Sequence, residues 1–361
     1  PLFLGVVKGT VGFSYELKYP YQAIRLAPYL AQFSEVFGSE NAETLSLQNL
    51  LAAAYKFIGD INQAIALYDN TLTVRLKNLD PKDPDIFAAM SDLAGAYKAK
   101  GDLFQAIPLY EQAVAGLSSL LPIDHREILA AKNNLAVAYR SAGNYEQSIP
   151  LHREVLQGYL DTLGSEHEET LISKVNLASA LDSKGRVCQE MTLISEARLL
   201  SEEAVCGLLK SLGPDHPATL VAQNCQASVY HSAGDLERAT SLYQKTLDKQ
   251  QEDPDFRLPD ALITQANLAD AYLSQGNAEE AIQLYEETLE SSKRTHGEKH
   301  SSTLSVRISL AEAYLAAKNF GRAADIFEEG LALFTAETSP DNPEIIHTQE
   351  LISQLRAKDT N

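Results

Sequence analysis

A short motif recurs along the chain at a nearly fixed interval. It reads L-A-x-A-Y-x-x-x-G, and one copy runs from Leu135 to Gly143. Successive steps between the marking glycines are 42, 42, 42, 49 and 42 residues. A fixed period of this size is typical of a solenoid, in which each repeat is one supersecondary unit that stacks on its neighbours. The glycines are Gly59, Gly101, Gly143, Gly185, Gly234 and Gly276.

The spacing of apolar residues predicts two helices in each repeat. In the first, here called helix A, apolar residues fall at i, i+3, i+4 and i+7, which is the helical period. The small alanines of the motif let the second helix, helix B, pack closely, and the glycine ends helix A. We expect helix A at 44–58, 86–100, 127–142, 170–184, 219–233, 260–275 and 303–318. Predicted caps of helix B are Asp60, Asp102, Asn144, Asp235 and Asn277.

The repeats extend over nearly the whole sequence and predict one fold class. We expect an all-α, right-handed superhelical solenoid of about eight antiparallel helix pairs. Residues 1–38 form a degenerate first repeat, in which 21–26 match helix B and Lys18 replaces the glycine. Residues 39–338 hold seven regular pairs, and 339–361 a capping helix with a tail. Because the chain begins with Pro1 rather than Met, we expect a fragment or a processed protein with further domains outside it.

One repeat is longer than the others. The 49-residue step places seven extra residues between Gly185 and Ala197, within 186–196. They predict either a lengthened turn between helices A and B or one added helical turn. Insertions in repeat proteins often lie on the binding face, so the segment is a candidate specificity loop. An inert insertion at the edge of the stack is the alternative.

Composition excludes several classes of partner. The chain has 30 Lys and Arg against 49 Asp and Glu, a formal net charge of −19. Nucleic acids and anionic membranes need a basic surface, so we expect neither as a partner. A basic partner is allowed, although an acidic surface also keeps proteins dispersed. No apolar run reaches the length of a membrane span, and three cysteines without metal spacing predict reduced thiols in a cytoplasmic setting.

The motif resembles that of the tetratricopeptide repeat family. Leu135, Ala136, Tyr139 and Gly143 stand at the offsets of that family, whereas Ser148 and His152 replace its Ala and aromatic residue. The pair is intact as Ala64/Tyr68, Ala106/Tyr110, Ala239/Tyr243, Ala281/Tyr285 and Ala323/Phe327. The 42-residue period is similar to the repeats of kinesin light chains and of sensor arrays in certain signalling NTPases. The resemblance implies a concave groove lined by helix A that binds an extended peptide or a partner helix.

Asparagine recurs at two adjacent positions just before the motif leucine. An Asn side chain both donates and accepts hydrogen bonds, so a row of them would hold a peptide main chain whatever its sequence. Asn is a poor helix former, and its recurrence inside helices needs a reason. The alternative is that these side chains are only solvated. The predicted groove residues are Asn49, Asn133, Asn134, Asn176, Asn224 and Asn267.

A basic residue follows the motif tyrosine in the first three regular repeats. These residues are Lys56, Lys98 and Arg140. On the same helix face they would pair with acidic groups of a ligand. A cation near a helix C-terminus also complements the helix dipole, which is the alternative explanation.

Histidine recurs once per linker, but the spacing argues against metal binding. Neighbouring repeats lie about 10 Å apart, whereas zinc ligands meet within a few ångströms. We therefore expect turn or cap residues in His125, His167, His216 and His300. No phosphate-binding loop, nucleophile elbow or metalloprotease motif is present. We expect no catalysis, cofactor or metal within these residues.

These observations favour a protein-interaction scaffold. Its partner would be a protein or peptide, held by the asparagines and selected by the basic column. One alternative is a partner-sensing or ligand-sensing module of a larger signalling NTPase. Another is a substrate-recruiting module of an enzyme whose catalytic domain lies outside this chain.

Overall fold

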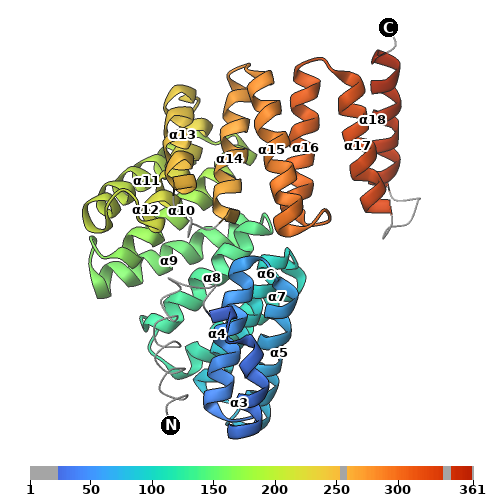
Figure 1. Ribbon diagram of the computed structural model, residues 1–361. Coiled ribbons are helices and arrows are strands. Elements are labelled where there is room, and N and C mark those ends of the chain that lie inside the picture. Colours follow the sequence, from blue (N-terminus) through green and yellow to red (C-terminus); the bar gives the residue numbers. More distant parts are fainter. Residues whose placement is uncertain (1–22, 253–257, 336–342, 360–361) are drawn as a thin grey trace. The chain divides into compact units, whose positions relative to one another are not determined.

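The chain folds into helices alone wherever the structure describes it. The computed structural model describes residues 23–252, 258–335 and 343–359, and all regular elements in these ranges are helices (Figure 1). This confirms the predicted all-α class. The chain divides into two compact units, Pro1–Ser183 and Lys184–Asn361. Within each unit, consecutive helices pack against one another, as expected for stacked helix pairs.

The helices follow the predicted repeats. The described part of unit 1 includes a short 3-10 helix (Ala27–Tyr29) and α3 (Leu30–Phe37). Its pairs are α4 (Ala42–Ile58) with α5 (Ile61–Asn78), α6 (Pro84–Lys100) with α7 (Leu103–Leu120), and α8 (Arg126–Ser141) with α9 (Tyr145–Leu163). The boundary between the units lies inside α10 (Glu168–Cys188). Lys18 and residues 21–22 of the predicted first-repeat segment 21–26 lie outside the described residues, and Ala23 within that segment is buried.

Unit 2 continues the same pattern. It holds α11 (Met191–Leu212), α12 (Pro217–Ser232) with α13 (Leu236–Glu252), α14 (Leu258–Ser274) with α15 (Ala278–His296), and α16 (Ser301–Ala316) with α17 (Phe320–Thr335). The last helix is α18 (Pro343–Asp359). The even-numbered helices from α4 to α16 are helices A, and their ends agree with the predicted ones to within two residues, except at the C-terminus of α10.

Small residues form the seams between paired helices. The motif alanines Ala52, Ala94 and Ala136 are completely buried, and so is Ala64 on the facing helix B. The helix B tyrosines fill the space beside them, and Tyr285 is wholly enclosed. A methyl group at each crossing lets the helix axes approach, so the alanine pattern acts as predicted.

In three repeats the helix A tyrosine forms a hydrogen bond to the preceding repeat. Tyr230 Oη donates to Glu202 Oε1 at 3.2 Å, and Tyr314 Oη donates to Glu286 Oε1 at 2.6 Å. Tyr139 makes the same bond to Glu111. In all three cases the acceptor lies 28 residues earlier, on helix B of the previous repeat. The motif tyrosine therefore contributes a directional contact as well as apolar area to the stacking.

The turn between helices A and B agrees with the prediction in part. Gly59 adopts the left-handed conformation with φ 89°, which favours glycine. Asp60 Oδ1 then accepts from the backbone N–H of Gln63, as expected for a cap. Asn144 and Asn277 also occupy the predicted N-cap position, but neither side chain makes a cap hydrogen bond. The amide of Asn144 donates instead to the side chain of Gln147.

The longer repeat corrects one turn prediction. Helix α10 does not end at Lys184 but continues through Gly185 to Cys188, and Gln189 takes the left-handed position with φ 55°. A Cβ at Gly185 would lie 2.7 Å from Cγ1 of Ile194 and 3.2 Å from the carbonyl oxygen of Glu190. Gly185 is thus a packing residue that lets α10 approach α11. Of the two alternatives for 186–196, the added helical turn is correct.

The linker histidines cap helix A, as predicted. The backbone N–H of Ala218 donates to Nδ1 of His216 at 3.2 Å, and that of Ser302 donates to Nδ1 of His300 at 3.2 Å. His125 and His167 accept the corresponding bonds in α8 and α10. Asn41 makes the equivalent bond in α4, at 2.9 Å. The imidazole nitrogen therefore accepts the hydrogen bond that a short polar N-cap side chain such as Asn usually accepts.

Replacing His216 by alanine is expected to lower the free energy of unfolding by about 1 kcal/mol, because one helix N–H loses its acceptor. The matched substitution His216→Asn should cost only a few tenths of a kcal/mol, since Asn41 already serves as this cap. Urea unfolding of the three proteins measures the difference. Equal losses for both variants would show that the ring packs rather than caps.

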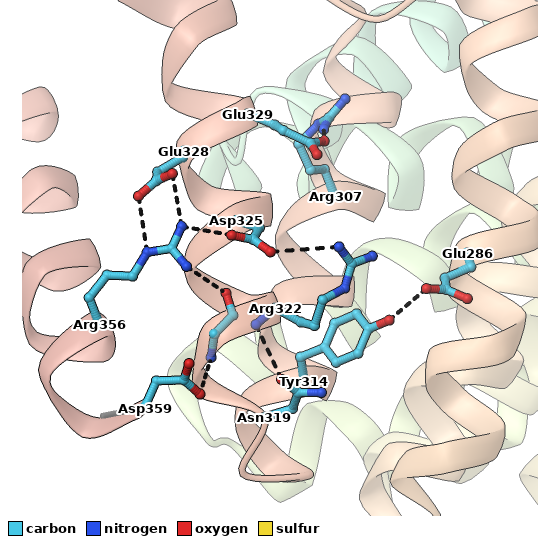
Figure 2. A network of polar contacts seen from close by, with 11 residues as sticks. Glu286, Arg307, Tyr314, Asn319, Arg322, Asp325, Glu328, Glu329, Arg356 and Asp359 are labelled. Carbon is cyan, nitrogen blue, oxygen red and sulfur yellow. Dashed lines mark hydrogen bonds and ion pairs between the residues drawn. The ribbon is translucent and has the colours of Figure 1, made fainter. Parts of the chain in front are cut away.

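The C-terminal helix is held on α17 by a polar network (Figure 2). Nη2 of Arg356 contacts Oδ1 of Asp325 at 2.7 Å and Oε2 of Glu328 at 3.0 Å. Oδ1 of Asp359 accepts from the backbone N–H of Gly321 at 3.0 Å. Ile352 is buried in the same apolar cluster as Ala324 and Ile326 of α17. We retain the proposal that α18 caps the array.

Among the described helices, none combines the length and the apolar character that a membrane span requires.

Candidate ligand-binding face

The predicted groove asparagines all lie on helices A and are half-buried. In unit 1, Nδ2 of Asn176 on α10 donates to Oδ1 of Asn133 on α8 at 3.0 Å. The two neighbouring helices A are therefore close enough here for one ligand to contact both. Oδ1 of Asn49 and Oδ1 of Asn224 are buried without a hydrogen-bond partner among the described residues. A buried acceptor without a partner costs free energy, and a hydrogen bond from a ligand donor would remove that cost.

Lys56 reaches into the next repeat of unit 1. Nζ of Lys56 lies 5.9 Å from the ring centroid of Tyr68. A Cβ added at Gly95, on the next helix A, would lie 3.5 Å from the same Nζ atom. Burial raises the pKa of the Asp92 carboxyl, and the positive charges of Lys56 and Arg75 offset only part of that effect. Lys56 therefore lies on the predicted face of helix A and also partly compensates the Asp92 carboxyl of its own chain.

Lys98 and Arg140 are half-buried in the last turns of α6 and α8. Their position suits the helix dipole, so the alternative explanation of the basic column is consistent with the geometry. Beside Arg140 lies His152, which is 1 % exposed, and neither of its ring nitrogens has a hydrogen-bond partner within the described part of the chain. Burial and the nearby Arg140 charge lower the pKa of His152 to about 4. The ring is a neutral replacement for the tyrosine that other repeats place here.

Unit 2 has a second polar centre on its helix A layer. Tyr285 Oη donates to Oδ1 of Asp270, the variable residue of the motif in α14. Burial raises the pKa of Asp270, while the Tyr285 hydrogen bond and the nearby charges of His231 and Arg186 act in the opposite direction. Nε2 of His231 lies 2.8 Å from Oγ of Ser274. The added turn of α10 thus carries Arg186 into the electrostatic neighbourhood of α14.

A cleft of about 370 Å³ opens between α14 and α16 over the end of α15. Its walls are mainly apolar, and the predicted groove residue Asn267 lies among them. The rings of His296 and His300 stack at one end with centroids 4.8 Å apart. Oγ of Ser302 lies 2.7 Å from Nδ1 of His300. An apolar cavity with a few polar groups is the usual form of a binding site.

Family models match most of the repeats. A model described as Tetratricopeptide repeat matches residues 42–119, 127–205 and 260–336, which together exceed half of the chain. The chain belongs to the tetratricopeptide repeat family. A second tetratricopeptide repeat model matches 226–255, and a third matches 87–164. A comparison with curated protein sequences gave no match.

Solved structures of tetratricopeptide repeat proteins are similar to this chain. Kinesin light chain TPR-like repeats from Podosopora anserina are 30% identical, with a TM-score of 0.48, and the match covers 58% of this chain and 95% of that one. A Rap protein complexed with Competence and Sporulation Factor is 12% identical, with a TM-score of 0.59 and coverage of 98% and 99%. A Pyrococcus horikoshii signal transduction ATPase with a tetratricopeptide repeat sensor is 15% identical, with a TM-score of 0.54 and coverage of 94% and 50%.

Sequence reasoning missed the acidic centres of this tetratricopeptide repeat protein. Asp270 occupies the variable position of the motif, where the other repeats carry Ala, Gly, Val, Ser or Glu. One signal was available: in the 42-residue register it stands directly in line with Glu312. The Tyr285 contact depends on helix B, 15 residues further on, and became evident only when the two helices were packed together.

Proposed function

We propose that this tetratricopeptide repeat chain is a non-catalytic module that binds a peptide or partner helix along the faces of its helices A. The observation that carries the proposal is the set of half-buried asparagines at repeat intervals, two of which leave an amide oxygen without a partner in the described residues. Asparagine amides accept from and donate to a peptide main chain. The cleft beside Asn267 provides a place for a ligand side chain.

Charge selection is the second part of the proposal. Lys98 and Arg140 present cations from α6 and α8 of unit 1, and acidic ligand groups would pair with them. We give Lys56 a smaller part because Asp92 already lies within its electrostatic reach. Unit 1 therefore favours ligands with acidic residues.

The similar structures support a partner-binding class. One is a Rap protein bound to a factor, and another is a sensor within a signalling ATPase. Both agree with a repeat module that recognises another molecule. The second also supports the alternative of a sensor module in a larger signalling protein. A substrate-recruiting module of an enzyme remains the third possibility. The full reading frame decides between a free scaffold and either larger protein.

A pull-down with the purified chain tests the proposal. Bait carrying Asn134→Ala, Asn176→Ala and Asn267→Ala should recover at least about tenfold less of the partner, because main-chain hydrogen bonds and packing are lost together. Asn62→Ala is the matched control, since Asn62 is exposed on helix B of its repeat. Circular dichroism checks that each bait is folded. Unchanged recovery by the folded triple variant refutes the assignment of this face.

A further inference from the structure

Three exposed aliphatic side chains lie on successive helices A of unit 2. Val221 on α12, Ile263 on α14 and Ile308 on α16 are 44%, 53% and 52% exposed. Single exposed apolar residues are ordinary on protein surfaces. Here, however, α14 contacts both α12 and α16, so the three helices are neighbours. In the described part of unit 1, no large apolar side chain of α4, α6 or α8 is exposed to this degree.

The repeat register places these side chains on one face. Val221 and Ile263 are 42 residues apart and therefore equivalent, and Ile308 is equivalent to Ala266. Ile263, Ala266 and Asn267 all line the cleft between α14 and α16. Residues three or four apart share a helix face. The aliphatic stripe, defined as Val221, Ile263 and Ile308, thus follows the cleft and its asparagine.

The charges beside the stripe are acidic. Glu312 lies one helical turn after Ile308, and Asp270 stands at the equivalent position of α14, two turns after Ile263. Burial raises the pKa of the Tyr285 hydroxyl, and the nearby Asp270 and Glu312 carboxylates raise it further. Glu312 is exposed. The positive charges of His231 and Arg186 act on Asp270. The charge next to the aliphatic stripe therefore suits a basic group.

The spacing of the helices sets the form of the ligand. Packed helices lie about 8–10 Å apart. Three residues of an extended polyproline-like chain span about 9 Å, and residues i and i+3 then point to the same side. An extended ligand with an aliphatic residue at every third position would place one such side chain on each helix A of unit 2.

We propose that α12, α14 and α16 bind an extended peptide with aliphatic residues three positions apart and a lysine or arginine beside them. The aliphatic side chains pack on Val221, Ile263 and Ile308, and one of them enters the cleft. The amide of Asn267 pairs with the peptide main chain, and the basic residue meets Glu312. This proposal rests on the proposed function and assigns the ligand class of unit 2.

Peptide selection from a random display library on the full chain tests this ligand class. Enriched peptides should carry aliphatic residues at i and i+3 with a lysine or arginine nearby. In fluorescence anisotropy, Ile263→Ser should weaken their binding at least about tenfold, because a buried isoleucine contact is lost. Glu312→Gln should weaken it about threefold or more at low salt. Leu199→Ser is the matched control, because Leu199 is 60% exposed on helix α11.

The outcomes separate this inference from the proposed function. If every enriched peptide loses affinity with Asn134→Ala but binds the Ile263→Ser protein normally, the unit 2 ligand class is overturned and groove binding stays in place. Peptides that the Ile263→Ser change weakens, and that therefore bind unit 2, overturn it as well if they are acidic or if their apolar residues follow a helical i, i+4, i+7 spacing. A selection that enriches nothing above the blank contradicts both proposals.

Discussion

Replacing Gly185 by leucine is expected to lower the free energy of unfolding by about 3 kcal/mol, the upper part of the range for overpacked cores. The new Cβ alone would lie 2.7 Å from Cγ1 of Ile194 and 3.2 Å from the backbone oxygen of Glu190. The side chain of Ile194 is 3% exposed, so it has little room to move away. Helix α10 would have to separate from the start of α11.

A second substitution distinguishes this clash from a general effect on the helix. In the Ile194→Ala background, Gly185→Leu should cost about 1 kcal/mol less, since contacting residues couple by this order. Long repeat arrays do not always unfold in one step. Hydrogen exchange of amides in α10 and α11 therefore complements urea unfolding. An identical cost in both backgrounds would place the strain at Glu190 instead of Ile194.

Changing Tyr285 to phenylalanine is expected to destabilise the protein by about 2 kcal/mol at neutral pH. The hydroxyl donates to the partly buried carboxylate of Asp270, and hydrogen bonds to charged groups contribute about 1.5–3 kcal/mol. In an Asp270→Asn background the same change should cost about 1 kcal/mol or less. Thermal or urea unfolding of the four proteins gives the coupling. Equal costs in both backgrounds would contradict the pairing.

The pH dependence of this pair has a definite sign. Burial raises the pKa of Asp270 in the folded state. The folded protein therefore binds the proton more readily, and this contribution is present below the ordinary pKa of about 3.9 and lost as pH rises through the raised value. Because the Tyr285 bond lowers the pKa, its removal should extend the loss to higher pH. Asp270→Asn should abolish this difference between the Tyr285 and Phe proteins.

The repeat pattern predicted local structure well because its signals act within a few residues. Ala52 and Ala94 were placed in the helix seams, and both are completely buried. His216 and His300 were predicted to cap or turn, and both accept a bond from the first turn of helix A. A cap needs only the adjacent backbone, so its sequence signal is sufficient.

The sequence failed where a residue's role depended on a distant partner. Gly185 matched the turn position, yet its surroundings are set by Ile194, nine residues later, and the helix passes through it. Lys56 was placed on the helix A face, but its reach toward Asp92 depends on how the next repeat stacks. The asparagines are a similar case. The sequence showed that they recur, but only the packed structure showed that they are half-buried.

By itself, the amino-acid sequence determined the helices, their pairing and the family, because a 42-residue period and small seam residues leave few other ways to bury the apolar faces. The tertiary structure decided which side chains of helix A are enclosed and which stay exposed. It placed Tyr285 against Asp270 and left Ile263 open beside a cleft. These differences arise from contacts between repeats, which a pattern within one repeat does not encode.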